Sequence, residues 1–142
     1  MNTVQTLAVD FNKTLMDLIR KVTKGDESRE VKWMRKVVGV GIGQAPMAPL
    51  EKYSAYLWEF REPINAMYNA EDDSFDWFIA RNQKKKITEK FTDKTSEDQR
   101  MILTLIDKAF DVFDSYPEEE KESVWESVAE LVKITAHYRQ TL

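Results

Sequence analysis

The residue types that carry most enzyme chemistry are scarce in this chain. His137 is the only histidine and there is no cysteine, so one chain cannot assemble a two-histidine metal site, a histidine relay or a thiolate nucleophile. A histidine near the end of a helix usually contacts solvent or the negative end of the helix dipole. We therefore predict that the protein is not an enzyme, and that it has no catalytic residue, no metal site and no cofactor.

One glycine-rich stretch, Gly39-Val40-Gly41-Ile42-Gly43, could expose backbone N–H groups to a phosphate. The phosphate-binding loop of nucleotide hydrolases ends in Gly-Lys-Ser/Thr, whereas Gln44-Ala45-Pro46 follows here. The dinucleotide-binding motif needs a preceding strand and a different spacing of its third glycine. The favoured interpretation is that residues 39–48 are a connection between helices rather than a phosphate site or a helix.

Three nearby aspartates, Asp72, Asp73 and Asp76, could be cation ligands. A calcium-binding EF-hand loop needs glycine at its sixth position and glutamate at its twelfth, and a loop counted from Asn69 has neither. Acids near the start of a helix are stabilised by the positive end of its dipole. These aspartates are therefore better explained as the acidic start of a short helix capped by Asp73 or Ser74.

Lysines cluster in the segment Lys84-Lys85-Lys86, with Lys90 and Lys94 downstream. Such a segment attracts anions, and a nucleic acid is one candidate. Acidic residues interleaved downstream dilute its field, and the pI of about 5.2 differs from that of a typical nucleic-acid-binding domain. A solvated loop is the favoured interpretation, and anion binding by Lys84, Lys85, Lys86 and Lys90 is the alternative.

An acidic and aromatic run surrounds three large rings, Phe75, Trp77 and Phe78. Three rings within four residues cannot all face one side of a helix, so either the segment is buried on two sides or one ring stays exposed. An exposed ring rimmed by acids is a typical docking patch for a protein. Asp73, Phe75, Asp76, Trp77 and Phe78 are therefore our candidate partner-binding residues.

The elements that position these groups are predicted from the whole composition. A chain of 142 residues with 42% hydrophobic and 32% charged residues fits one globular domain, residues 1–142. No apolar stretch approaches the roughly 20 residues of a membrane-spanning helix, and the N-terminus lacks a basic-then-apolar leader. We expect an intracellular protein that neither spans a membrane nor is secreted.

Apolar side chains at three- and four-residue intervals predict helices along most of the chain. In the first helix, over residues 3–24, the stripe consists of Val4, Leu7, Ala8, Phe11, Leu15, Leu18, Ile19 and Val22. Asn2 or Thr3 can cap this helix, and Gly25 can adopt the left-handed conformation that follows a helix end. The second helix is expected to start at Ser28 and to end before Gly39.

The third helix begins near Leu50, and Pro63 must kink or divide it near Glu62. After the short acidic helix, Ser96 and Gln99 form the capping-box pattern of the next helix, which stops at Tyr116-Pro117. In the last helix, which opens at Pro117, the stripe consists of Val124, Val128, Leu131 and Thr135. The fold class predicted is all-α, a compact bundle of about five to six amphipathic helices.

Three blocks of the sequence resemble small, largely uncharacterised α-helical proteins of the nucleocytoplasmic large DNA viruses. They are residues 11–19, the stretch from Tyr56 to Ile79 that includes Phe60 and Pro63, and the stretch from Tyr116 to Val132. The resemblance implies a viral accessory protein or virion component, located in the cytoplasm or the virion. It identifies no active residue.

Two functions follow as hypotheses. The first is a non-enzymatic helical protein that acts by protein–protein contact or self-association, as a structural, virion or virus-assembly component. The second is a nucleic-acid-associated accessory protein that binds through the basic segment Lys84 to Lys94.

Overall fold

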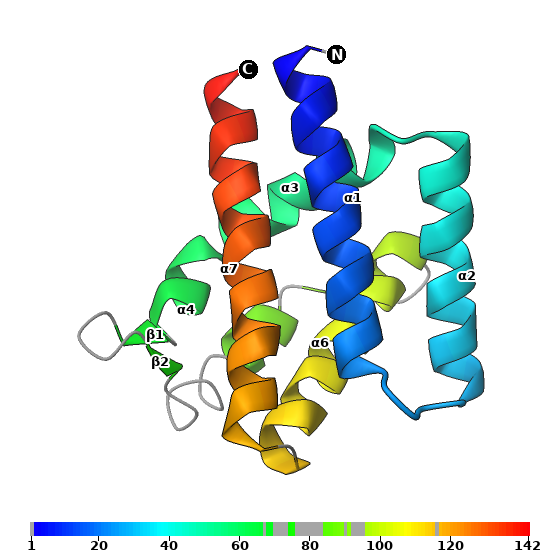
Figure 1. The fold of residues 1–142 in the computed structure, drawn as a ribbon, viewed down its shortest axis with the longest axis vertical. Helices are drawn as coiled ribbons and strands as arrows, with labels where there is room; N and C mark the ends of the chain where they lie inside the picture. The colour runs from blue at the N-terminus through cyan, green and yellow to red at the C-terminus, as the bar shows by residue number, and fades with distance from the viewer. Residues whose placement is uncertain are drawn as a thin grey trace.

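The computed structural model of the chain describes residues 2–66, 68–69, 74–75, 84–89, 91, 96–115 and 117–142. Figure 1 shows α1 (Thr3–Val22) and α7 (Glu118–Gln140) side by side and running in opposite directions, so both chain ends lie at the same end of the molecule. The helices α3 (Ala48–Glu59) and α6 (Glu97–Ser115) cross behind this pair, and α2 (Arg29–Gln44) flanks α1. The predicted all-α bundle is confirmed.

The first helix follows its sequence signals closely. Asn2 caps α1 by accepting a bond from the Gln5 N–H at 2.8 Å, and the Gln5 side chain accepts the Asn2 N–H at 2.9 Å. This reciprocal pair satisfies two N–H groups that the helix leaves free. The predicted stripe is buried from Leu7 to Val22, and Gly25 has the expected positive φ of 78° in the turn that follows.

The second helix is longer than predicted. Ser28 caps it as expected, accepting the Val31 N–H at 3.3 Å, but α2 continues to Gln44, so the predicted connection over residues 39–48 is wrong. Ile42 lies four residues after the buried Val38 and packs against the core. Burial of this last apolar position offsets the helix cost of the glycines. The helix ends only before Pro46, which disfavours a helical residue ahead of it.

The division of the third helix is confirmed. The chain leaves α3 at Glu59 and begins α4 (Arg61–Ala66) after a break at Phe60. Glu59 is the fourth residue before Pro63, so the break removes the clash that a proline causes with that carbonyl. Pro63 then stands in the first turn of α4, where an absent N–H costs no helical bond.

The predicted short helix starting at Asp73 or Ser74 is wrong at its described residues. Ser74 and Phe75 form a short strand, β2, which pairs antiparallel with β1 (Tyr68–Asn69). The pairing joins Tyr68 to Phe75 and Asn69 to Ser74. When two strands pair, the N–H and C=O groups of one segment bond to those of the other. A helix-cap signal within one segment carries no information about such a distant partner. Residues 76–83 lie outside the described part of the chain.

The starts of α6 and α7 agree with prediction. Ser96 accepts the Gln99 N–H at 3.3 Å at the start of α6, and α7 begins directly after Pro117. Residues 84–88 form a helical turn, so the predicted solvated loop is wrong at these residues. Ile87 and Phe91 are buried in the core and hold this segment against the bundle. In the described residues no helix combines the length and the apolarity that crossing a membrane requires.

One core unites these elements, and long polar side chains connect the helices around it. Among the described residues, the buried members of this core are Leu7, Ala8, Phe11, Leu15, Leu18, Ile19, Val22, Met34, Val38, Leu50, Phe60, Ile64, Ile87, Phe91, Met101, Phe110, Val124, Trp125, Leu131 and Ile134. Lys21 of α1 donates to Ser127 Oγ of α7 at 2.7 Å, and Asp26 pairs with Lys108 of α6 at 2.6 Å. These contacts set the register of the helices around the core.

Candidate functional site

The predicted partner-binding residues are only partly covered by the structure. Asp73, Asp76, Trp77 and Phe78 lie outside the described residues, and Phe75 is described through its backbone in β2. The prediction that these residues form a docking patch therefore stays a prediction.

The basic segment carries less free charge than its sequence suggests. Lys84 Nζ lies 3.1 Å from Asp107 Oδ1 of α6 and 5.4 Å from the centre of the Phe110 ring. Lys85 Nζ lies 3.9 Å from Glu89 Oε1, while Lys86 is exposed and Lys90 lies outside the described residues. Because two of these lysines face carboxylates, the field available to a polyanion is reduced. The anion-binding alternative stays a prediction.

The glycine-rich stretch has no free N–H cradle. Gly39, Gly41 and Gly43 lie within α2, where backbone N–H groups bond to carbonyls four residues earlier. The Gly41 carbonyl is likewise occupied, since it accepts the Ala45 N–H at 2.9 Å. A phosphate would therefore meet a closed helix here rather than a loop.

His137 is exposed in the last turns of α7, as predicted. Within the described ranges, no three metal-ligating side chains gather.

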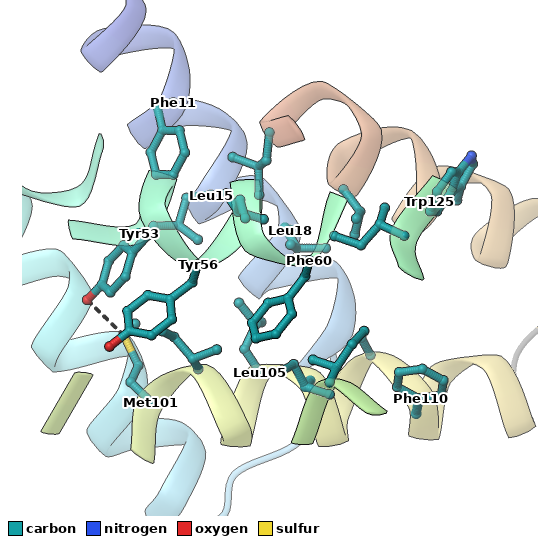
Figure 2. Close-up of a pocket in the computed structure, with 18 residues that line it drawn as sticks. Phe11, Leu15, Leu18, Tyr53, Tyr56, Phe60, Met101, Leu105, Phe110 and Trp125 are labelled. Atoms are coloured by element: carbon teal, nitrogen blue, oxygen red, sulfur yellow. Dashed lines mark hydrogen bonds between the residues drawn. The ribbon is translucent and has the colours of Figure 1, made fainter. Parts of the chain in front are cut away.

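An apolar cavity of about 150 Å³, partly open to solvent, lies between α1 and α7 on one side and α3 and α6 on the other. Figure 2 shows its labelled residues, which come from α1, α3, α6, α7 and the break at Phe60, with Tyr53, Tyr56 and Met101 at one end and Phe110 and Trp125 at the other. The lining consists of Phe11, Leu15, Leu18, Tyr53, Tyr56, Leu57, Phe60, Ile64, Ile87, Met101, Ile102, Leu105, Ile106, Ala109, Phe110, Trp125, Val128 and Leu131.

The walls of this cavity are almost free of polar groups. The Tyr53 hydroxyl donates to Met101 Sδ at 3.5 Å, so its donor is used within the wall. Burial raises the pKa of Tyr53, and the nearby carboxylate of Asp98 acts in the same direction. The phenol therefore stays neutral at all ordinary pH values.

An aromatic cluster closes one side of the cavity. The ring of Phe91 lies 5.3 Å from that of Tyr56 and 5.2 Å from that of Phe60, both in tilted contacts. Tilted rings at this separation attract each other through their quadrupoles. These contacts hold Phe91 against the end of α3. They also stiffen the cavity wall to which the rings of Tyr56 and Phe60 belong.

Two of the tryptophans that the structure describes, Trp33 and Trp58, are partly exposed, and each lies under arginine. In the first case Arg100 lies 4.1 Å over the ring of Trp33, but it also bonds Glu30 through two nitrogens at 3.2 and 3.3 Å. Thr104 donates to the same carboxylate at 3.1 Å, and the Arg100 bonds are the main reason that the pKa of Glu30 is lowered. This group therefore joins α2 to α6.

The second tryptophan has no such carboxylate. Arg61 lies 4.2 Å and Arg139 lies 5.1 Å from the centre of the Trp58 ring. Arg61 also donates to the Trp58 carbonyl, and Arg139 is exposed. In the described part of the chain neither guanidinium forms an ion pair with a carboxylate. We call Trp58, Arg61 and Arg139 the Trp58 surface.

Sequence reasoning identified neither the cavity nor the Trp58 surface. Several cavity residues, among them Phe11, Leu15 and Leu131, were correctly predicted on apolar helix faces. How well opposing faces fill the space between them, however, has no sequence signal. Arg139 stands about eighty residues after Trp58 in the sequence, so no local pattern links the two residues. Comparisons of the chain with protein families, with curated proteins and with solved structures find no match.

Proposed function

We propose that this protein is a non-enzymatic helical protein that acts by contact with a protein partner, and that the Trp58 surface is part of the contact. The observation that supports this most directly is a partly exposed tryptophan beneath two guanidinium groups, Arg61 and Arg139, neither of which forms an ion pair with a carboxylate of the described residues. Tryptophan and arginine are the residue types that most often dominate the energy of protein interfaces.

The contrast with Trp33 strengthens this proposal. Arg100, which lies over Trp33, donates its hydrogen bonds to Glu30. The Arg100–Glu30 pair therefore joins α2 to α6. At Trp58 the exposed Arg139 makes no such bond to a residue that the structure describes, so its guanidinium edge can meet a partner. A planar guanidinium edge matches a carboxylate with two parallel hydrogen bonds. The proposed partner is therefore an acidic protein segment that brings an apolar side chain onto the ring.

Binding of synthetic acidic peptides tests this proposal. Fluorescent twelve-residue peptides that combine several Glu or Asp residues with one aromatic residue are titrated with the purified chain. We expect binding that weakens with salt, and that falls roughly thirtyfold in Trp58→Ala, the size of a typical interface hot spot. Arg139→Gln should weaken binding about tenfold.

Arg20→Gln is the matched control, because Arg20 is an exposed arginine of α1 that lies outside the Trp58 surface. It should leave the affinity unchanged. Equal affinity of the wild type and both Trp58-surface variants, or no binding of any acidic peptide, would count against the proposal.

From the resemblance of residues 11–19, 56–79 and 116–132, we further propose that this contact belongs to a virion or to virus assembly. Mass spectrometry of purified particles and of infected-cell fractions tests this point separately. Absence from both would remove the viral role without affecting the proposed contact at Trp58.

A further inference from the structure

The cavity between α1 and α7 on one side and α3 and α6 on the other is partly open to solvent, and it is large compared with the voids of protein interiors. Protein cores are packed as densely as organic crystals, and voids larger than a water molecule are few. A volume of about 150 Å³ is roughly ten times the space that one water molecule requires on the same measure. The fold therefore leaves room for a molecule, not only for a packing defect.

Water is a poor occupant of this space. A buried water needs two to four polar partners, and among the described lining residues only Tyr53 and Tyr56 carry hydroxyl groups. The Tyr53 hydroxyl already donates to Met101 Sδ. None of the lining side chains that the structure describes is charged, so an ion would lose its hydration without compensation.

The shape and chemistry of the walls favour a small hydrocarbon. Aromatic rings stand at both ends, Tyr53 and Tyr56 at one and Phe110 and Trp125 at the other, with aliphatic side chains between them (Figure 2). Dry apolar cavities of about this volume accept molecules the size of benzene. Several lining residues, including Ile102 and Leu105, are only half-buried, which gives such a molecule a route from solvent.

We propose that this cavity is a binding site for a small uncharged apolar molecule, aromatic or aliphatic, of about six to eight non-hydrogen atoms. The inference is independent of the protein contact proposed at Trp58, because Trp58 is not among the lining residues. A ligand of this size gains its affinity from apolar burial alone, so a dissociation constant on the order of 0.1–1 mM is expected.

Benzene and toluene are the probes, and the thermal unfolding midpoint and NMR chemical shifts are the measurements. Binding to the folded state alone raises the midpoint, so both probes should raise it, whereas benzoate should not. Benzoate has the same ring but a charge that the apolar walls cannot solvate.

Ala109→Leu fills part of the cavity from α6, where Ala109 is a lining residue, and should abolish the shift caused by benzene. Ala55→Leu is the matched control, because Ala55 is exposed on α3 and does not line the cavity, and it should keep the full shift. A second variant, Leu105→Ala, enlarges the cavity and should strengthen binding of the larger probe, toluene.

Three outcomes would overturn the proposal. One is the absence of any shift with benzene and toluene in the wild type, which would mean that the cavity is closed to ligands. Another is an undiminished shift in a folded Ala109→Leu variant, which would place the binding elsewhere. The third is equal binding of benzoate, which a site without polar partners cannot provide.

Discussion

Replacing the three glycines of α2 by alanine should stabilise the protein. Gly39, Gly41 and Gly43 all lie in the helix Arg29–Gln44, and a Cβ added at any of them meets no atom within 4 Å. Alanine in a helix interior is favoured over glycine by about 1 kcal/mol, because glycine loses more backbone entropy on folding. The substitution therefore adds helix propensity without creating a clash.

The expected magnitude follows from the place of each glycine. Gly39 and Gly41 should each contribute close to the full amount, while Gly43 is the residue before the last of the helix and should contribute less. The triple variant should gain about 2 kcal/mol in the free energy of unfolding. For a chain of this length the unfolding entropy is about 0.3 kcal/mol/K, so the melting temperature should rise by roughly 7 °C.

Thermal and urea unfolding followed by circular dichroism measure this gain. Gly25→Ala is the control, because Gly25 has a φ of 78° that alanine adopts only with strain, and it should lose about 1–2 kcal/mol. A triple variant that is no more stable than the wild type would refute the reasoning. Such a result would instead support the sequence-based prediction of a connection over residues 39–48. In a connection, glycine often adopts backbone conformations that alanine adopts only with strain, so alanine would bring no gain.

Two further predictions concern polar groups in the interior and between helices. Thr135→Val should raise stability by about 1 kcal/mol in urea unfolding, since Thr135 Oγ1 is buried with no hydrogen-bond partner in the described residues. Thr23→Val should instead lower it by about 1–2 kcal/mol, because the Thr23 hydroxyl bonds the Ile19 carbonyl and the Arg35 guanidinium; the same sign in both variants would contradict this explanation. The bond from Lys108, with help from the Ser28 N–H, lowers the pKa of Asp26 from 3.8 to about 2. A carboxyl group whose pKa is lowered by folding stabilises the folded state above pH 4, and this stabilisation is lost as the pH falls from 4 toward 2. Asp26→Asn should therefore reduce the free energy of unfolding by about 1 kcal/mol at pH 6, after allowance for solvent screening, and by almost nothing at pH 2. A cost independent of pH would show that the charge of Asp26 is not the cause.

The helix starts capped by Asn2, Ser28 and Ser96 were the most predictable part of the fold. Asn2 with Gln5, Ser28, and Ser96 with Gln99 act through bonds to backbone groups within three residues of the cap. Such signals are contained in a few adjacent residues, so a sequence displays them directly. The prediction failed where a local signal competed with a distant one, as at Gly39, where the burial of Ile42 in the core keeps the helix intact.

Buried polar groups show the same limit. Asn12 is a polar residue that is buried among the apolar residues of α1. Its side-chain amide donates to the Pro46 carbonyl at 2.8 Å. Its partner stands 34 residues away, and nothing near Asn12 in the sequence identifies it. Likewise Tyr68 and Phe75 pair as strands because two segments meet, which no cap or periodicity within either segment specifies.

The amino-acid sequence by itself determined most of the helical segments, the capped starts of α1, α2 and α6 and which helix faces are apolar, because those features depend on bonds and spacings within a few residues. Only the tertiary structure decided that Arg61 and Arg139 meet over Trp58 and that six separate segments leave a cavity between Tyr53 and Trp125. Apolar patterning requires that these faces be buried, but it is the angles and offsets at which helices meet that decide whether their side chains fill the space.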